Sequence, residues 1–576
     1  MRTRRTVAYA APVLALALAA TACGGGGGDD GGGGEAPSLD DIAASDLNPQ
    51  PREELQEGGI FIYGSSQPVP QLMTHHTDGN LGAGVEIMKA VMPSAFRYTD
   101  EGEAEPNPAY VESFEQNDEG TEMTFVLNKD AEWSNGEPIT WEDYEQQWKT
   151  LSGQEDGDFG APGEVYAYQS VEDIEEGGDE YEFTVTFSEP FAEYGMLFEN
   201  LYPKEVMEDA DRFNKDYMDD IPITAGPFDF KELDKSSDTV ILERNEDFWG
   251  EKALLDEIHF QPGDPEGQAQ AFANGEIDGF YVGYTASTYE TASSREDGHV
   301  TQAIDNGYRY IEMNADSPVL SDVDVRHAVM LGIDRSALAQ LSLEGINWPS
   351  DPTANRLLRS SDPAFQDNSG DLGEQDPDRA RELLDGAGWT LDGEDAKVRT
   401  NEDGEELEMR YFCPAGLKVC ESEAEVTKEM LGEIGIKVTT DSIPTEAFFN
   451  DHIYTGDFEL ASFVQVGTTP YVGESFENHT GPFGDDGEDW GNNNARTSTD
   501  EINEKFDELR QTVDPEEYGK LANEIDALLW ENGQGIPFFQ RTGTYAMADG
   551  LANVGGPGLQ SNWHYEDIGW TELPER

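Results

Sequence analysis

Short strand-like and helix-like stretches alternate along the whole chain, and this alternation constrains the fold more than any other feature of the sequence. Strand patterns rich in β-branched and aromatic residues cover 59–63, 122–127, 181–187, 239–243, 255–260 and 407–412. Helical patterns cover 84–91, 141–151, 324–331, 377–384, 421–431 and 516–530. Two helix starts carry caps, Thr140 before Trp141 and Asp376 before Pro377. The sequence therefore predicts the α/β class with more than one lobe, and the lack of a 20–50-residue repeat argues against a solenoid or a propeller.

Length and composition agree with several ordered units. A chain of 576 residues is expected to divide into two or three structural units. Its 10 Trp, 22 Tyr and 27 Phe supply enough large side chains for ordinary cores, so disorder throughout is not expected.

The charge balance is strongly acidic, with 120 Asp and Glu against 35 Lys and Arg and a formal net charge of −85. Such a chain lacks the clustered basic residues that bind phosphates, which argues against a nucleic-acid-binding function. The acids are spread along the whole sequence. We expect a solvated acidic surface of the kind suited to salty surroundings, where salt screens the self-repulsion.

The first 50 residues are expected to be an export signal and a tether. Arg2, Arg4 and Arg5 precede an apolar stretch over 7–20, which is too short to span a bilayer comfortably, and small residues lead directly to Cys23. This arrangement resembles a bacterial lipobox, although Ala20 stands where leucine is usual. We therefore expect a signal peptide over 1–22, a lipid on Cys23, a Gly-rich tether over 23–50, and attachment to the outer face of the cell membrane. A plain secretory signal followed by a linker is the alternative.

Two cysteines remain after Cys23. Cys413 ends a strand-like stretch and Cys420 opens a helix-like one, with a short loop between them. In an oxidising compartment this pair is expected to form a structural disulfide. A redox pair would instead require Cys-x-x-Cys spacing.

No catalytic or metal-binding signature occurs in the sequence. The serine hydrolase, zinc protease, P-loop and dinucleotide-binding motifs are all missing. The adjacent pair His75–His76 would point to opposite sides of an extended chain, and paired carboxylates carry no information among 120 acids. We expect no cofactor, no metal site and no enzymatic activity.

Eight ordered motifs resemble the oligopeptide- and dipeptide-binding proteins of ABC importers, the family 5 extracellular solute-binding proteins. The most distinctive is Trp-Ser-Asn-Gly-Glu-Pro-Ile-Thr-Trp over 133–141, in which a tight Asn-Gly turn precedes a capped helix. Further motifs occur at 201–204, 224–228, 242–250, 255–258, 274–278, 310–314 and 324–335. The segment 48–59 and the motif variants resemble an actinobacterial branch that includes mycobacterial lipoproteins linked to phosphatidylinositol-mannoside assembly.

The resemblance implies a two-lobed fold of the periplasmic-binding-protein type (type II, cluster C) with an extra inserted domain. Domain I would comprise 51–98, 199–300 and 536–576, domain II 99–198, and domain III 301–535. A hinge crossed twice by the chain would join domains I and III. Closure of the two lobes would bury a ligand between them.

The resemblance also implies the residues that face the ligand. One set is the loop after the first strand, and the other is the loop after a strand of domain III: Thr77, Asp78, Gly79 and Asn80, then Phe463, Val464, Gln465, Val466 and Gly467. Tyr308 and Tyr310 are further candidates for the cleft, although we expect alternation along the strand to leave at least one of them in ordinary core or surface.

One departure from the family pattern bears on the ligand. Peptide-binding members keep an aspartate four residues before a proline, and it pairs with the peptide's α-ammonium. Pro470 here has Val466 at that place, and a buried unpaired ammonium would cost several kcal/mol. Either Asp78 replaces the missing acid, its alternative role being that of a turn residue beside Gly79, or the ligand is not a free N-terminus.

The sequence thus predicts a monomeric binding protein for peptides or a similar extended solute, with ABC permease and ATPase subunits as partners. The membrane would be contacted through the lipid anchor alone. Two other functions remain open: a non-transporting scaffold for a cell-wall glycolipid or a lipoprotein partner, and an exported hydrolase.

Overall fold

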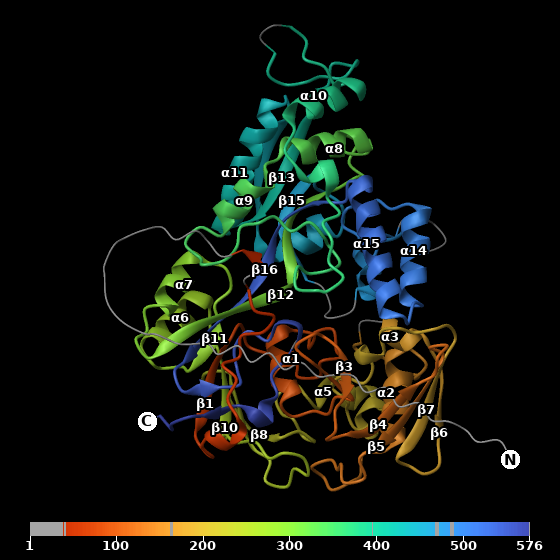
Figure 1. Ribbon diagram of the computed structural model, residues 1–576, viewed down its shortest axis with the longest axis vertical. Coiled ribbons are helices and arrows are strands. Elements are labelled where there is room, and N and C mark those ends of the chain that lie inside the picture. The colour runs from red at the N-terminus through yellow and green to blue at the C-terminus, as the bar shows by residue number, and fades with distance from the viewer. Residues whose placement is uncertain are drawn as a thin grey trace, which may run out of the picture. The chain divides into compact units, whose positions relative to one another are not determined.

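The fold is built around one mixed sheet of ten strands (Figure 1). The computed structural model describes residues 38–574 except 40–41, 162–164, 394–395, 467–471, 484–488 and 561. The signal peptide, Cys23 and most of the tether therefore lie outside the described residues. The strands in spatial order are β14 (Lys437–Ile443), β13 (Glu408–Pro414), β15 (Leu460–Val466), β12 (Gly298–Met313), β16 (Ile536–Ala548), β11 (Gly279–Tyr281), β1 (Ile60–Ser65), β10 (Glu257–Pro262), β9 (Thr239–Arg244) and β8 (Phe228–Asp234).

Two long strands, β12 and β16, lie in the middle of this sheet and connect its two ends. β12 pairs antiparallel with β16 over most of its length, and its last seven residues also pair with β15. At the opposite end, β16 pairs with β11, which lies beside β1. A β-bulge interrupts the β12–β16 ladder between Ile304 and Tyr308, and the Gln540 amide donates there to the carbonyls of Asp305 and Gly307 (3.0 and 2.7 Å).

We call the part built on β1 and β8–β11 the first half, and the part built on β13–β15 the second half. The helices of the first half are α1 (Gly82–Lys89), α4 (Lys204–Met207), α5 (Ala210–Lys215), α6 (Pro265–Ala273) and α7 (Ala286–Ala292). Those of the second half are α8 (Val323–Gly332), α9 (Arg335–Ser342), α10 (Pro377–Gly386), α11 (Lys418–Glu433), α12 (Thr445–Ala447), α13 (Phe476–His479), α14 (Asp500–Arg510) and α15 (Pro515–Asn532).

A separate antiparallel sheet is inserted between strands of the first half. Its order is β4 (Val111–Gln116), β5 (Glu122–Leu127), β7 (Glu182–Phe187) and β6 (Val171–Glu176), with α2 (Trp141–Leu151) and α3 (Tyr166–Gln169) in the connection between β5 and β6. Two small pairs complete the strands: β2 (Phe96–Tyr98) with β3 (Ala104–Pro106), and β17 (Leu551–Ala552) with β18 (Gly569–Trp570).

The inserted sheet shares its apolar core with the first half, while the second half has a core of its own. The rings of Phe125 and Phe183 stack 4.8 Å apart in the shared core. The inserted sheet is also joined to the second half, because the Glu193 carboxylate accepts hydrogen bonds from the Gly473 amide (2.6 Å) and the Tyr518 hydroxyl (2.5 Å). In the described part of the chain, no helix is both long enough and apolar enough to cross a bilayer.

Candidate functional site

The predicted residues Tyr308, Tyr310, Phe463 and Gln465 lie together on one face of the β12–β15 pair. The register sets Tyr308 opposite Gln465 and Tyr310 opposite Phe463, and side chains two residues apart on a strand point to the same side. The rings of Tyr308 and Tyr310 are 5.4 Å apart, and those of Tyr310 and Phe463 are 5.0 Å apart. Alternation therefore does not separate the two tyrosines, since they lie two residues apart; both are buried, at 7% and 5% exposure.

The predicted segment from Phe463 to Gly467 differs from the sequence expectation in another way. The segment Phe463–Val466 was expected in a loop, but it forms the end of β15, because its backbone pairs with β12. Val464 lies opposite Arg309 and so belongs to the other face of the strand. Val466 is exposed, with 55% of its surface accessible. Gly467 and Pro470 lie outside the described residues.

A buried acid completes the aromatic face. Glu312 follows Tyr310 on the same side of β12 and accepts a hydrogen bond from the Tyr310 hydroxyl (3.1 Å) and one from the Met313 amide (3.1 Å). Burial raises the pKa of Glu312 to about 7 from an ordinary value of 4.5, and these two hydrogen bonds oppose the shift.

A pocket opens beside Tyr308 and Gln465. Its walls come from β12, β15, β16, α13 and the connection between α9 and α10, and they comprise Tyr308, Asn355, Arg356, Leu357, Leu358, Arg359, Gln465, Val466, Val472, Ser475, Asn478, His479 and Gln540. We call this the arginine pocket. None of these lining residues is an Asp or a Glu, although 120 of the 576 residues in the chain are acidic. The pocket therefore differs sharply from the rest of the chain in its charge.

Arg356 is held rigidly behind this pocket. Its guanidinium pairs with the buried Asp526 (3.3 Å), donates to the carbonyls of Gln534 and Gly535, and lies over the Trp530 ring. The neighbouring His479 Nδ1 is 3.0 Å from Gln534 Oε1, and burial lowers the pKa of His479 to about 4, so its ring is neutral at pH 7. The sequence analysis missed these residues. The one available signal was the pair Arg356 and Arg359, two arginines three positions apart in a chain poor in basic residues.

The other predicted loop, Thr77–Asn80, lies in the first half. The Thr77 amide and hydroxyl both donate to the Gly160 carbonyl (2.8 and 2.9 Å). Gly79 is required by close packing, because a Cβ there would lie 2.0 Å from the Met73 carbonyl oxygen. Asp78 has a side chain that is 76% exposed and lies 3.9 Å from His76 Nδ1. No contact between this loop and the aromatic face occurs among the described residues, so the structure does not bring the two predicted sets together.

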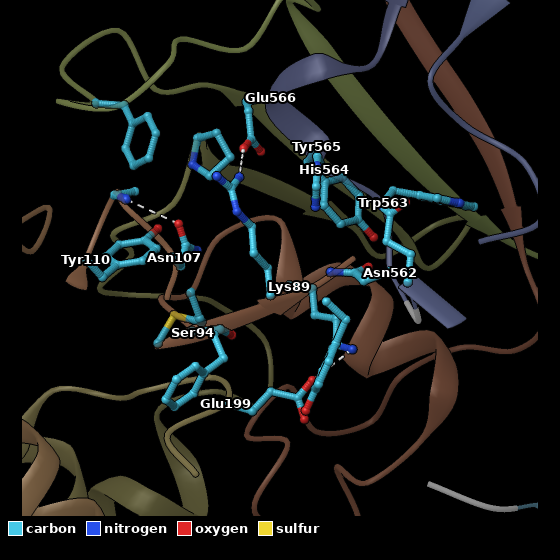
Figure 2. Close-up of a pocket in the computed structure, with 18 residues that line it drawn as sticks. Lys89, Ser94, Asn107, Tyr110, Glu199, Asn562, Trp563, His564, Tyr565 and Glu566 are labelled. Atoms are coloured by element: carbon cyan, nitrogen blue, oxygen red, sulfur yellow. Dashed lines mark hydrogen bonds and ion pairs between the residues drawn. The ribbon is translucent and has the colours of Figure 1, made fainter. Parts of the chain in front are cut away.

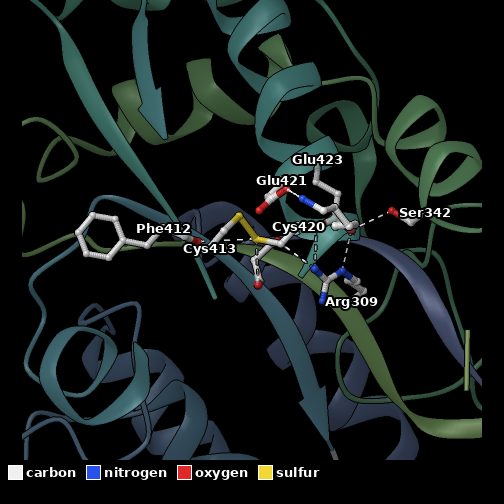
Figure 3. Close-up of a disulfide and its surroundings, with 9 residues drawn as sticks. Arg309, Ser342, Phe412, Cys413, Cys420, Glu421 and Glu423 are labelled. Carbon is white, nitrogen blue, oxygen red and sulfur yellow. Dashed lines mark hydrogen bonds and ion pairs between the residues drawn. A yellow bond between two sulfur atoms is a disulfide. The ribbon is translucent and has the colours of Figure 1, made fainter. Parts of the chain in front are cut away.

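The side chains on the other face of the β12–β15 pair, opposite the tyrosines, have a structural role. Arg309 Nε and Nη2 donate to Glu423 Oε1 and Oε2, each at 2.7 Å, and the hydroxyls of Ser342 and Ser462 donate to the same carboxylate (Figure 3). Beside this network, Cys413 and Cys420 are joined by a disulfide with Cα atoms 5.7 Å apart. These groups brace α11 against the sheet.

A second pocket lies in the first half, between the end of α1, β2 and residues 560–566 (Figure 2). Its charged groups pair with one another: Lys89 Nζ lies 2.8 Å from Glu199 Oε1, and Arg97 Nη1 lies 3.7 Å from Glu566 Oε1. It contains none of the predicted site residues. Within the described ranges, no group of three His, Cys, Asp or Glu side chains is placed to hold a metal ion.

Comparison with known proteins supports a role in binding solutes. Residues 105–486 match the family described as bacterial extracellular solute-binding proteins, family 5. The chain is 30% identical to the oligopeptide-binding protein OppA of Mycobacterium tuberculosis over 547 residues, covering 93% of this chain and 89% of that protein. The probable monoacyl phosphatidylinositol tetramannoside-binding protein LpqW of the same organism is 23% identical over 482 residues, covering 76% and 72%. The likeness to the mannoside-linked branch is thus the weaker of the two.

Solved structures share the whole architecture. The periplasmic EDTA-binding protein EppA superposes with a TM-score of 0.80 at 21% identity, covering 92% of this chain and 98% of that one. The oligopeptide-binding protein AppA of Bacillus subtilis, solved with a nonapeptide, gives 0.71 at 20% identity, covering 90% and 100%. These likenesses confirm the expected α/β periplasmic-binding-protein fold of cluster C with its extra domain. Because the family match spans more than half of the residues, the chain belongs to the family 5 bacterial extracellular solute-binding proteins.

Proposed function

We propose that this protein is the substrate-binding component of an ABC importer, and that it captures peptides between two hinged lobes. The observation that carries the proposal is the 30% identity with a protein named for oligopeptide binding, sustained over 93% of the chain. Family membership also confirms that the chain is a binding protein and not an enzyme. The domain division given above, with the hinge at β12 and β16, is part of the proposal.

The β15 strand offers a place for an extended ligand. β13 pairs with β15 only at Leu460 and Ala461, whereas β12 pairs with it as far as Val466. The outer backbone edge of β15 beyond Ala461 therefore faces no other strand of the described sheet. A peptide added there would form main-chain hydrogen bonds, which give affinity without strong sequence preference.

Titration calorimetry of the mature protein with matched free and N-acetylated peptides tests this function. Val466 offers apolar surface where other members place an acid, so no ion pair is lost on acetylation. We expect acetylation to change the binding free energy by less than ~1 kcal/mol. A loss of a few kcal/mol in binding free energy would show that another acid holds the peptide's N-terminus. Asp78 is the first candidate for that acid, and the variant Asp78→Asn would test it.

The alternative function is a scaffold that binds a cell-wall glycolipid, and the match to LpqW favours it over a hydrolase. Mass spectrometry of ligands that purify with the protein distinguishes the two. Co-purified peptides support import. A mannosylated lipid, together with failure to bind either form of the peptides, would replace the peptide proposal with the scaffold.

Export and lipid anchoring through Cys23 complete the proposal. The support is the run of small residues that ends at Cys23, directly before a glycine-rich segment. Cys23→Ser is expected to release the protein from the membrane fraction, because the lipid would be its only attachment. Mutant protein that still sediments with membranes would show that the anchor is wrong.

A further inference from the structure

The contact between the inserted sheet and the second half is centred on a buried acid, Glu193. This residue follows β7, on the return of the chain to the first half, and it is 0% exposed. Its Oε1 atom accepts hydrogen bonds from the Tyr518 hydroxyl (2.5 Å) and from the Gly473 amide (2.6 Å). Both donors belong to the second half, since Gly473 follows β15 and Tyr518 lies on α15 (Figure 1).

The same contact fixes a short stretch of backbone in the second half. The Tyr518 hydroxyl accepts hydrogen bonds from the amides of Val472 and Gly473 (2.9 and 3.1 Å) while it donates to Glu193. Burial and the charge of Glu193 raise the pKa of Tyr518 well above its ordinary value of 10, so the hydroxyl keeps the proton that it donates. A Cβ atom at Gly473 would lie 2.5 Å from Glu193 Oε1, so the approach requires glycine.

This stretch of backbone opens one wall of the arginine pocket. Val472 lines the pocket, and so do Ser475, Asn478 and His479 a few residues further on. Between them, Phe476 packs against the core that the inserted sheet shares with the first half, and also against the apolar cluster of α14 and α15. The placement of this wall therefore depends on a contact made from the inserted sheet.

The contact joins two parts of the molecule that the proposed hinge would separate. The inserted sheet shares its core with the first half, whereas Gly473 and Tyr518 belong to the second half. Rotation about β12 and β16 away from the present arrangement would draw Glu193 away from both donors. A contact made in only one of two arrangements shifts the equilibrium toward that arrangement. The buried hydrogen bonds of Glu193 therefore favour the arrangement in which the two halves are together.

We propose that Glu193 is a positioning residue for solute capture: through Tyr518 and Gly473 it holds the wall of the arginine pocket and stabilises the closed molecule. This inference rests on the proposed function and deepens it, because it assigns the inserted sheet a part in controlling the site. Glu193 lies outside the lining of the pocket, so it would act on affinity without touching the solute.

Titration calorimetry with tri-, tetra- and pentaalanine tests the proposal on wild type, E193A, E193Q and E175A. We expect E193A to weaken binding about 10-fold, because the closed molecule loses two hydrogen bonds to a charged acceptor. E193Q keeps an oxygen that can accept both bonds and should recover most of the affinity. E175A is the matched control, since it removes the same charge from an exposed position on β6 of the inserted sheet, and it should change nothing.

A second variant, Y518F, removes one hydroxyl and leaves Glu193 in place. Because it breaks the same contact, the double variant E193A/Y518F should bind no more weakly than the weaker of the two single variants. Losses that add, or unchanged affinity in both single variants, overturn the inference. A purely structural role for Glu193 would lower the melting temperature of the ligand-free protein and leave the affinity unchanged, which also overturns it. If E193A does not fold, the affinity of Y518F decides.

Failure of the proposed function is distinguishable from failure of this inference. If wild type binds none of the three peptides, peptide capture is contradicted, and hydrogen exchange of the ligand-free protein decides the inference. Faster exchange of the backbone amides of 472–479 in E193A than in wild type and E175A supports it. Equal exchange in all three proteins refutes it.

Discussion

The buried ion pair between Arg309 and Glu423 gives a sharp prediction about stability. The two side chains are 2% and 0% exposed, and the carboxylate of Glu423 accepts two hydrogen bonds from Arg309 and one each from Ser342 and Ser462. Arg309→Met removes both charge-assisted bonds and leaves an ionised carboxylate with two hydroxyl partners. Such a loss costs about 3–5 kcal/mol, because the remaining charge is buried and uncompensated.

One further variant separates the effect of the buried charge from that of the packing. Replacing both partners, as in R309M/E423M, removes the buried charge altogether and should recover stability to within about 1–2 kcal/mol of wild type.

Urea denaturation followed by circular dichroism measures the free energies of unfolding of wild type, R309M and the double variant. The reasoning is refuted if R309M costs less than about 1 kcal/mol, or if the double variant is as unstable as the single one. Either result would mean that the Arg309–Glu423 contact contributes little beyond the space it fills.

Three further outcomes follow from features described above. Glu312 holds its proton more tightly in the folded state, because its pKa is raised to about 7. Its contribution to the free energy of unfolding is therefore fully present below pH 4.5 and falls by up to about 3 kcal/mol as the pH rises past 7. The urea midpoint of Glu312→Gln should lose this pH dependence, and identical pH profiles for the variant and wild type would contradict the prediction. Replacing Cys413 and Cys420 by serine removes a disulfide between residues seven positions apart and should lower the free energy of unfolding by roughly 2–3 kcal/mol. The variant is compared with wild type with and without reductant, and the reductant should destabilise wild type alone. With a net charge of −85, the melting temperature should rise from ~0.05 M to ~1 M NaCl as the screening length shortens from ~14 Å to ~3 Å; a flat or falling curve would argue against a salt-adapted surface.

Local sequence signals placed the six predicted helices to within a few residues, but they missed others, such as α6, α9 and α14. The helix over 141–151 was expected at its observed bounds, and the Thr140 amide donates to Asp143 at its start. The long strands β12 and β16 were missed because their inner residues are buried on both sides and show no alternation. Periodicity could not identify them, since they are defined by pairing with strands far away in the sequence.

The site was predicted only in part, for a related reason. Tyr308, Tyr310 and Phe463 were found through the family resemblance, and their common face follows from the register of β12 against β15. Arg356 and Arg359 come from an irregular connection that carries no motif, and nothing in the sequence separates their roles. Only the folded structure shows that the guanidinium of Arg356 pairs with the buried Asp526.

The bulge in β12 has a mechanical consequence. If the two halves rotate about the proposed hinge, the β12–β16 pair would be twisted, and the twist would concentrate where the bulge interrupts the ladder. Gln540 donates to two carbonyls at that point and also lines the arginine pocket. On the proposed function, a solute group that competed for the Gln540 amide would weaken the hydrogen bonds at the bulge, so that filling the pocket and bending the molecule would involve the same side chain.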